Sequence, residues 1–157
     1  MKEQRVYQIT QKKHRQLKKK ALELEIRRQQ LNKDWEKAVI EGDDRETDAI
    51  TVSLKLLHEN ELERRELNHI LRNVTILDRK ITPTIEIGST AIVKIDNKKK
   101  KIMIVDPIEA DPLQNKYSYE SPIGKALLGL NEGDEATYSS PNGVKTRLQV
   151  VSVDGGR

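Results

Sequence analysis

Apolar residues recur at helical spacing along the first half of the chain. From Gln11 to Ile40 there is no Gly or Pro, the two residues that most weaken a helix. One apolar stripe in this stretch follows a heptad repeat interrupted at Arg28 and consists of Leu17, Ala21, Leu24, Leu31, Trp35 and Ala38. Gly42 ends the pattern. The stripe predicts one long helix, about 45 Å in length for some thirty residues.

A second stretch without Gly or Pro runs from Thr47 to Ile81, and its apolar stripe is less regular. Glu61 and Arg64 fall at positions where core residues are expected. The apolar positions are Ile50, Leu54 and Leu57 before them and Leu67, Ile70, Val74 and Leu77 after them, one step out of phase. Because a short turn separates two helices of similar length, we expect an antiparallel coiled-coil hairpin, with Trp35 holding the helices together near the turn.

The pattern changes to strands after Thr82-Pro83-Thr84, where Pro83 is expected to end the second helix. Two β-rich runs, 85–95 and 101–105, flank a turn at 96–100. Residues 136–139 and 145–153 form a second predicted hairpin, and a short helix is predicted over 121–130, capped by Ser121 with Pro122 at its first position. The predicted fold class is α+β, with a coiled-coil hairpin over residues 1–78 and an antiparallel sheet with one short helix over residues 84–157.

Composition narrows the class of protein. Of 157 residues, 35% are hydrophobic and 34% charged, which suits a chain with an exposed helical hairpin. The absence of Cys excludes a disulfide framework and a thiolate zinc site, and fits a cytoplasmic location. No apolar run approaches the length of a membrane span, so we expect neither a signal peptide nor a membrane partner. The net charge of +4 favours an acidic partner.

The turn between the two predicted helices concentrates negative charge. Residues 1–40 hold twelve Lys and Arg against five Asp and Glu, whereas the turn contains five carboxylates: Glu41, Asp43, Asp44, Glu46 and Asp48. The spacing of Asp43 and Glu46 is also that of a helix capping box, with Asp in place of Ser or Thr. A cap accounts for two acids and not for five, and mutual repulsion favours a bound cation or a cationic partner at this tip.

Two other groups of polar residues admit ordinary explanations. The run Lys98–Lys101 allows either contact with phosphate or a solvated turn, and the sequence leaves both open. His14, His58 and His69 lie on the predicted helices without a second ligand at metal-binding spacing, so they are expected to be surface or seam residues.

Six short motifs stand out in the C-terminal half: Ile87–Thr90, Ile104–Pro107, Glu109–Pro112, Ser121–Gly129, Glu132–Glu135 and Ser140–Gly143. As a set they closely resemble the C-terminal domain of the bacterial Gre family of transcript-cleavage and elongation factors. The N-terminal half matches by architecture, as an antiparallel coiled coil with an acidic turn, so the resemblance covers the full length. It implies an FKBP-like fold for the C-terminal domain.

The resemblance also implies a function. In a Gre factor the hairpin enters the secondary channel of RNA polymerase, and the tip acids, here Asp43 and Glu46, hold a second Mg²⁺ that is shared with the polymerase only in the complex. Mg²⁺ takes one or two carboxylates and keeps several waters, which suits such a site. The implied protein is a monomer without its own cofactor and is not itself an enzyme. It stimulates the polymerase to cleave backtracked nascent RNA, and Glu120, Ser121 and Pro122 dock on the polymerase.

The tip departs from the family pattern, which is usually Gly-Asp-Leu-Ser-Glu-Asn-Ala. Here Asp44, Arg45 and Thr47 replace the Leu, Ser and Asn. A guanidinium between two carboxylates can pair with them and compete with a metal. The alternative function is therefore a Gre-like polymerase-binding regulator or inhibitor that does not stimulate cleavage.

Two further functions are disfavoured by the scarcity of aromatic residues. The pocket of a peptidyl-prolyl isomerase would be apolar and aromatic-lined, whereas residues 84–157 contain three Tyr and no Phe or Trp. A free-standing nucleic-acid-binding protein would need an aromatic and basic platform for bases, which the chain lacks.

Overall fold

The protein folds into two compact units. The computed structural model describes residues 5–41, 47–78 and 82–154. One unit combines Met1–Lys13 with Val74–Arg157, and the other is His14–Asn73. These units have other bounds than the predicted domains 1–78 and 84–157, because the start of the chain and the segment after Asn73 make their contacts with the C-terminal sheet domain. The α+β class predicted from the sequence is confirmed.

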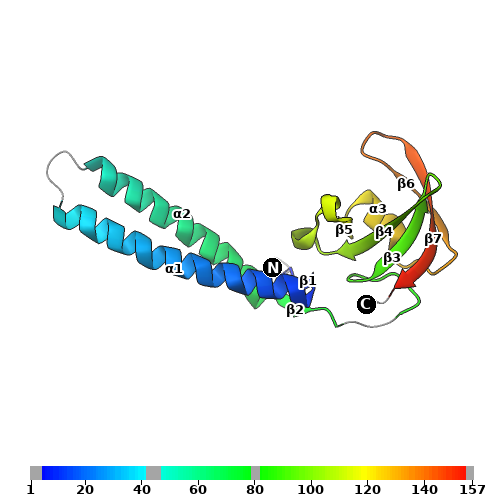
Figure 1. Ribbon diagram of the computed structural model, residues 1–157, viewed down its shortest axis with the longest axis horizontal. Helices are drawn as coiled ribbons and strands as arrows, with labels where there is room; N and C mark the ends of the chain where they lie inside the picture. Colours follow the sequence, from blue (N-terminus) through cyan, green and yellow to red (C-terminus); the bar gives the residue numbers. More distant parts are fainter. Residues whose placement is uncertain (1–4, 42–46, 79–81, 155–157) are drawn as a thin grey trace. The chain divides into compact units, whose positions relative to one another are not determined.

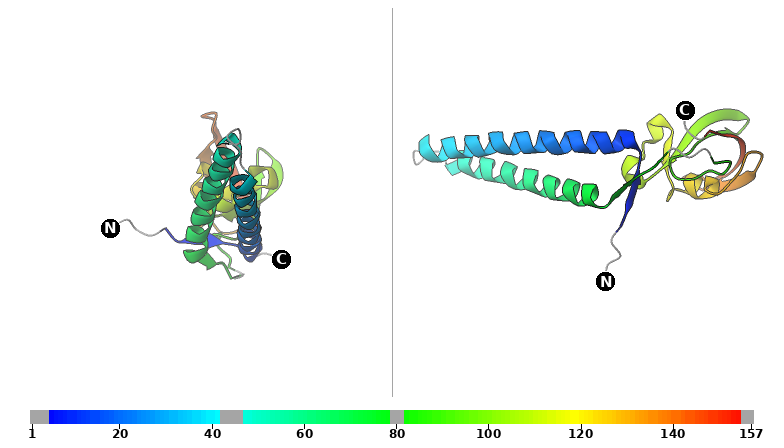
Figure 2. Two further views of the ribbon diagram at one scale, coloured as in Figure 1. Left: turned by 90° about the vertical axis from the view of Figure 1, so that its left-hand side faces the viewer. Right: turned by 90° about the horizontal axis from the view of Figure 1, so that it is seen from below.

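Two long helices lie side by side and form the hairpin (Figures 1 and 2). α1 spans Gln11–Glu41 and α2 spans Thr47–Arg72. The predicted stripe on α1 faces α2, and the side chains buried in the hairpin are Leu24, Leu31, Asn60 and Leu67. Leu54, predicted as a seam residue, is 50% exposed. The described parts of these helices are too polar or too short in their apolar runs to cross a membrane.

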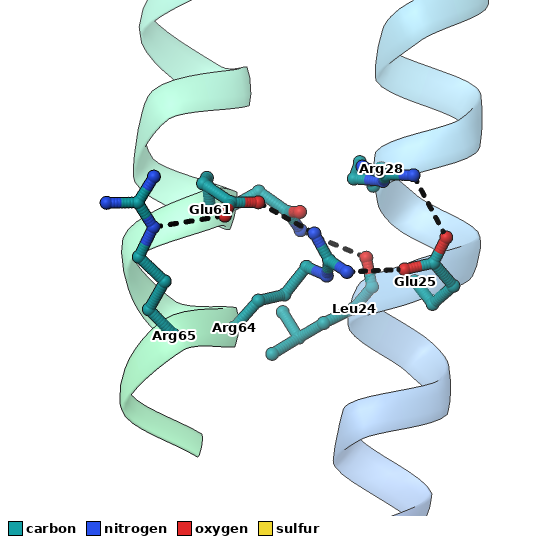
Figure 3. Close-up of polar contacts among 7 residues, drawn as sticks. Leu24, Glu25, Arg28, Glu61, Arg64 and Arg65 are labelled. Atoms are coloured by element: carbon teal, nitrogen blue, oxygen red, sulfur yellow. Dashed lines mark hydrogen bonds and ion pairs between the residues drawn. The ribbon is translucent and has the colours of Figure 1, made fainter. Parts of the chain in front are cut away.

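A polar layer of Glu25, Glu61 and Arg64 interrupts the apolar seam (Figure 3). Asn60 belongs to the same layer. Arg64 bridges the helices, with Nη2 2.8 Å from Glu25 Oε2 and Nη1 2.7 Å from Glu61 Oε2. Asn60 is 3% exposed, and its Nδ2 donates a hydrogen bond of 3.2 Å to the Leu24 carbonyl. Glu61 and Arg64, the two polar residues that the sequence places at core positions, therefore pair with each other, and Arg64 also pairs with Glu25 across the hairpin.

The second helix ends earlier than predicted. It stops at Arg72 rather than at Thr82-Pro83, because Asn73 closes the last turn: its N–H donates to the Ile70 carbonyl and its Nδ2 to the His69 carbonyl. The β-branched residues Val74 and Thr75 then enter a strand. Val74 and Leu77, predicted as seam residues of the helix, consequently lie outside it.

A short strand pair joins the two ends of the hairpin. β1 (Tyr7–Ile9) runs parallel to β2 (Val74–Ile76), with Tyr7 opposite Val74 and Ile9 opposite Ile76. The side chain of Ile9 is fully buried, and its carbonyl accepts a hydrogen bond from the Leu77 N–H. Nothing in the sequence analysis predicted this pair, because its two strands are separated by the whole hairpin.

The C-terminal domain is a curled five-stranded sheet (Figure 1). The strand order is β5-β4-β3-β7-β6. The strands are β3 (Thr90–Ile95), β4 (Lys98–Val105), β5 (Lys116–Ser118), β6 (Glu135–Ser139) and β7 (Lys145–Asp154). The sheet is mixed rather than wholly antiparallel, since β5 pairs in parallel with β4. The 3-10 helices η1 (Pro107–Glu109) and η2 (Pro112–Gln114) supply the crossover that a parallel pair requires.

The two predicted hairpins of this sheet are confirmed, but the turn of the first hairpin is shorter than the predicted turn at 96–100. β3 and β4 are joined by Asp96 and Asn97 alone, and both have positive φ, as a two-residue turn between antiparallel strands requires. Lys98–Lys100, predicted as part of the turn, therefore belong to β4. β6 and β7 pair as predicted.

The core of this domain lies between one face of the sheet and α3 (Pro122–Leu127). Alternation along β3 buries Ala91, Val93 and Ile95 and turns Lys94 to the opposite face. The buried members of this core are Ile85, Ala91, Val93, Ile95, Ile102, Ile104, Ile123, Leu127, Leu148 and Val150. A fully buried Leu127 fixes α3, and with it the segment that precedes α3, on the sheet.

Candidate docking site of the C-terminal domain

The predicted tip acids Asp43 and Glu46, with Asp44 and Arg45 between them, lie outside the described residues. Metal binding there stays a prediction. Within the described ranges, no group of three or more His, Asp or Glu side chains is placed to hold a metal ion.

The predicted docking residues Glu120, Ser121 and Pro122, called here the docking segment, lead into α3. Ser121 has an extended backbone, and its hydroxyl accepts a hydrogen bond of 3.1 Å from the Gly124 N–H. The same hydroxyl donates to the Ser118 carbonyl at 2.6 Å. The predicted N-cap is thus confirmed, and Pro122 occupies the first turn, where its missing N–H costs nothing. The Glu120 N–H donates a further hydrogen bond of 3.0 Å to the Ser118 hydroxyl, so hydrogen bonds hold the first two residues of the segment.

Gly124 lets α3 approach the end of β5 closely. A Cβ added at this position would lie 2.0 Å from the Ser118 carbonyl oxygen and 2.9 Å from Tyr119 Cα. No side chain fits at such a distance. Gly124 therefore fixes the path of the docking segment across the edge of the sheet.

An arginine from the start of the chain reaches the docking segment. Arg5 Nη2 lies 3.3 Å from Glu120 Oε1 and 3.8 Å from Asp106 Oδ1, and the guanidinium carbon is 5.3 Å from the centre of the Tyr7 ring. Burial, together with the negative charges of Asp106 and Glu120, raises the pKa of the Tyr119 phenol. Arg, Tyr and Pro side chains gather here around one partly exposed carboxylate.

Asp106 is a buried carboxylate that ties the N-terminal strand to the sheet domain. Its side chain is 1% exposed; Oδ1 accepts from the Ile108 N–H and Oδ2 from the Gln8 N–H, each at 3.2 Å. The first bond caps η1. The second bond satisfies a backbone donor of β1 and so places the strand next to Arg5 and the docking segment.

Glu109 makes a second contact of this kind. Its side chain is 2% exposed, and it accepts from the Thr10 N–H at 3.1 Å, from the Thr10 hydroxyl at 2.7 Å and from Lys116 Nζ at 3.1 Å. The Thr10 hydroxyl in turn accepts from the Lys13 N–H and caps the first turn of α1. Sequence reasoning missed Arg5, Thr10, Asp106 and Glu109 as a group. Asp106 and Glu109 stood within two of the Gre-like motifs, but partners about a hundred residues away leave no local signal.

A family comparison agrees with this geometry. The family model described as "Transcription elongation factor, GreA/GreB, C-term" matches residues 80–155, which include the sheet, α3 and the docking segment. The C-terminal domain belongs to the GreA/GreB family. The Gre resemblance predicted from the sequence motifs is confirmed for this domain.

Curated relatives carry the same family name. The transcription elongation factor GreA of Clostridium kluyveri is 33% identical over 92 residues, which are 56% of this chain and 57% of that protein. GreA of Macrococcus caseolyticus is 36% identical over 96 residues, 59% of this chain and 61% of that protein. The match to this chain thus spans little more than half the length of these GreA proteins.

Solved structures of related proteins cover more of the chain. The GreA factor homolog 1 (Gfh1) of Thermus thermophilus aligns with 96% of this chain and 99% of its own, at 25% identity and a TM-score of 0.47. The GreA/GreB protein of Nitrosomonas europaea aligns with 68% of this chain and 91% of its own, at 29% identity and a TM-score of 0.40.

Proposed function

We propose that this protein is a Gre-type elongation factor that binds bacterial RNA polymerase and stimulates cleavage of backtracked nascent RNA. The observation that carries the proposal is the GreA/GreB family match over residues 80–155, which include the five-stranded sheet and α3. The protein acts as a monomer in the cytoplasm. It is not itself an enzyme, because the bond is broken in the active site of the polymerase.

Docking occurs through the C-terminal domain. The docking segment is rigid, since hydrogen bonds hold Ser121 on both sides and Gly124 packs against the Ser118 backbone. A rigid segment loses little conformational entropy on binding. Arg and Tyr side chains, which dominate binding hot spots, lie beside it in Arg5, Tyr7 and Tyr119.

The hairpin supplies the reach to a distant site. α1 has 31 residues, and at 1.5 Å per residue it extends about 46 Å. The turn that follows α1 would bring Asp43 and Glu46 into the secondary channel, where both carboxylates would bind the second Mg²⁺ of the polymerase. Hard carboxylate oxygens suit this ion, and a second metal stabilises the leaving oxygen during phosphodiester cleavage.

Arg45 supports a second candidate function. A guanidinium between Asp43 and Glu46 can neutralise the two acids and keep them from the metal, and Asp44 adds a further charge that the family pattern lacks. A factor with such a tip would occupy the channel and inhibit the polymerase without stimulating cleavage.

Release of RNA from a stalled, backtracked elongation complex distinguishes the two functions. In the stimulating factor, Asp43→Asn or Glu46→Gln should reduce cleavage by orders of magnitude while leaving polymerase affinity nearly unchanged. Arg45→Ser should raise the rate. If the wild-type protein is inert and the double variant Asp44→Leu, Arg45→Ser restores nothing, the stimulating function is wrong and the inhibitor is the better account.

A separate measurement tests docking. Glu120→Lys combined with Pro122→Ala should weaken binding of the full chain to polymerase, because both side chains are exposed and α3 keeps its Ser121 cap. Glu132→Lys, an exposed site in the same domain with the same charge change, serves as the control and should bind like the wild type. Equal affinities for all three proteins would show that the docking face is wrongly assigned.

A further inference from the structure

One face of the sheet gathers lysines on neighbouring strands. Lys94 on β3 lies directly opposite Lys99 on β4, and Lys101 is two residues further along β4 opposite Ile92. Side chains directly opposite each other, and those two residues apart, share a face of a sheet. Since Ala91, Val93 and Ile95 point into the core, the three lysines lie on the other side, called here the outer face.

These charges are not neutralised within the chain. Among the described residues, none of Lys94, Lys99 and Lys101 forms an ion pair with a carboxylate. Arg147, on the same face of β7, contrasts with them because it is paired with Glu135. Like charges directly opposite each other destabilise a sheet, so this arrangement costs stability in the free protein.

Protection of a sheet edge explains only part of the cluster. The first half of β4 has no partner on its far side, because β5 pairs only with Met103–Val105, and exposed edges often hold lysines that prevent aggregation. This reason accounts for Lys99 and Lys101. It does not account for Lys94, because β3 is flanked by β4 and β7.

We propose that the outer face binds the phosphate backbone of double-stranded nucleic acid through Lys94, Lys99 and Lys101, without regard to sequence. Protein interfaces are enriched in aromatic residues and depleted of Lys, so a lysine cluster favours phosphate over an acidic protein. Single strands are held by stacking on aromatic rings, and β3, β4 and β7 contain none. The outer face is distinct from the docking segment, so this inference does not depend on the proposed function.

Binding of the full chain to a short fluorescein-labelled DNA duplex of mixed sequence, measured by anisotropy, tests the proposal. Each phosphate neutralised contributes about −0.9 to the slope of log affinity against log salt, so three lysines should give about −2.7 between roughly 50 and 200 mM salt. Lys99→Gln with Lys101→Gln should reduce the size of that slope by about 1.8 and weaken binding about tenfold or more.

The same strand provides a matched control. Lys98 and Lys100 are also exposed but alternate to the other side of β4, and replacing both by Gln changes the net charge by the same amount. A second control, Lys18→Gln with Lys33→Gln, makes the same change in net charge on α1. The proposal requires the Lys99, Lys101 variant to lose clearly more affinity than either control. Equal losses, a larger loss from the α1 pair, tighter binding of a single strand, or no binding of the duplex at the lowest salt would each overturn it.

Stability provides a second readout. Lys94→Gln removes one of two like charges that face each other, so it should raise the urea midpoint of the sheet domain at low salt, and the gain should vanish at high salt. An unchanged midpoint at low salt would contradict the argument that the cluster costs stability.

Discussion

Glu109→Gln tests whether the N-terminal strand belongs to the sheet domain. The buried carboxylate accepts from three donors, and an amide offers one oxygen and turns an NH₂ group toward the remaining donors. A hydrogen bond to a charged group contributes about 1.5–3 kcal/mol, and removing one partner of a buried ion pair costs about 3–5 kcal/mol. Because the Lys116 side chain is 20% exposed and can regain water, we expect the lower end, a loss of about 3 kcal/mol.

Amide hydrogen exchange of the full chain, followed by NMR, measures this loss in each unit separately. The Thr10 N–H and the core amides of Val93 and Ile104 should exchange about 100-fold faster, since about 1.4 kcal/mol corresponds to a factor of ten. The amide of Leu67, in the hairpin unit, should be unaffected. Faster exchange confined to the hairpin, or no change at Thr10, would refute the assignment of residues up to Lys13 to the sheet domain.

A double-mutant cycle then isolates the long-range contact. Thr10→Val removes the hydroxyl that donates to Glu109. The double variant should lose about 1.5 kcal/mol less stability than the sum of the two single losses, because both single changes remove the same hydrogen bond. Thr137→Val on β6, at the opposite edge of the sheet, is the matched control and should be additive with Glu109→Gln within about 0.5 kcal/mol. Additivity in both cycles would contradict the direct contact between Thr10 and Glu109.

Three further changes have defined outcomes. Gly124→Ala should destabilise the sheet domain by about 3 kcal/mol or more in urea unfolding, because the new Cβ meets the Ser118 carbonyl, whereas the neighbouring exposed Lys125→Ala should cost less than about 0.5 kcal/mol; equal costs would contradict the close approach. Asn60→Leu should raise the stability of the hairpin by about 1–2 kcal/mol by removing a buried amide whose oxygen lacks a partner among the described groups, and a loss measured by circular dichroism would show that the amide stabilises the hairpin. A hydrogen bond from Arg65, followed by the charge of Arg64, lowers the pKa of Glu61 from its usual 4.5. The ionised Glu61 therefore stabilises the hairpin fully above pH 4.5, and this stabilisation is lost as the pH falls through the lowered pKa. Hairpin amides should exchange faster in that acidic window, and Glu61→Gln should abolish this part of the pH dependence.

The sequence by itself determined the elements that rest on local physics. The heptad stripe on α1 fixed which side chains face α2, because helical periodicity is a property of neighbours three and four residues apart. Ser121 and Pro122 likewise specified the start of α3, and Ser121 is its N-cap as predicted. Asp96 and Asn97 accept a positive φ and formed the turn of the first hairpin, with only its length misjudged.

Only the tertiary structure decided the features that join distant parts of the chain. Asn73 closes the last turn of α2, and the residues after it, Val74–Ile76, form a strand because they pair with β1, some seventy residues earlier. Burial of Glu109 depends on Thr10, and its charge is acceptable in the interior only because three donors converge on it. The run Lys98–Lys101 was evident in the sequence. Only strand pairing divided these lysines between the two faces of the sheet and placed Lys94 directly opposite Lys99 on the outer face. Register between strands is set by packing against the core, which no local pattern contains.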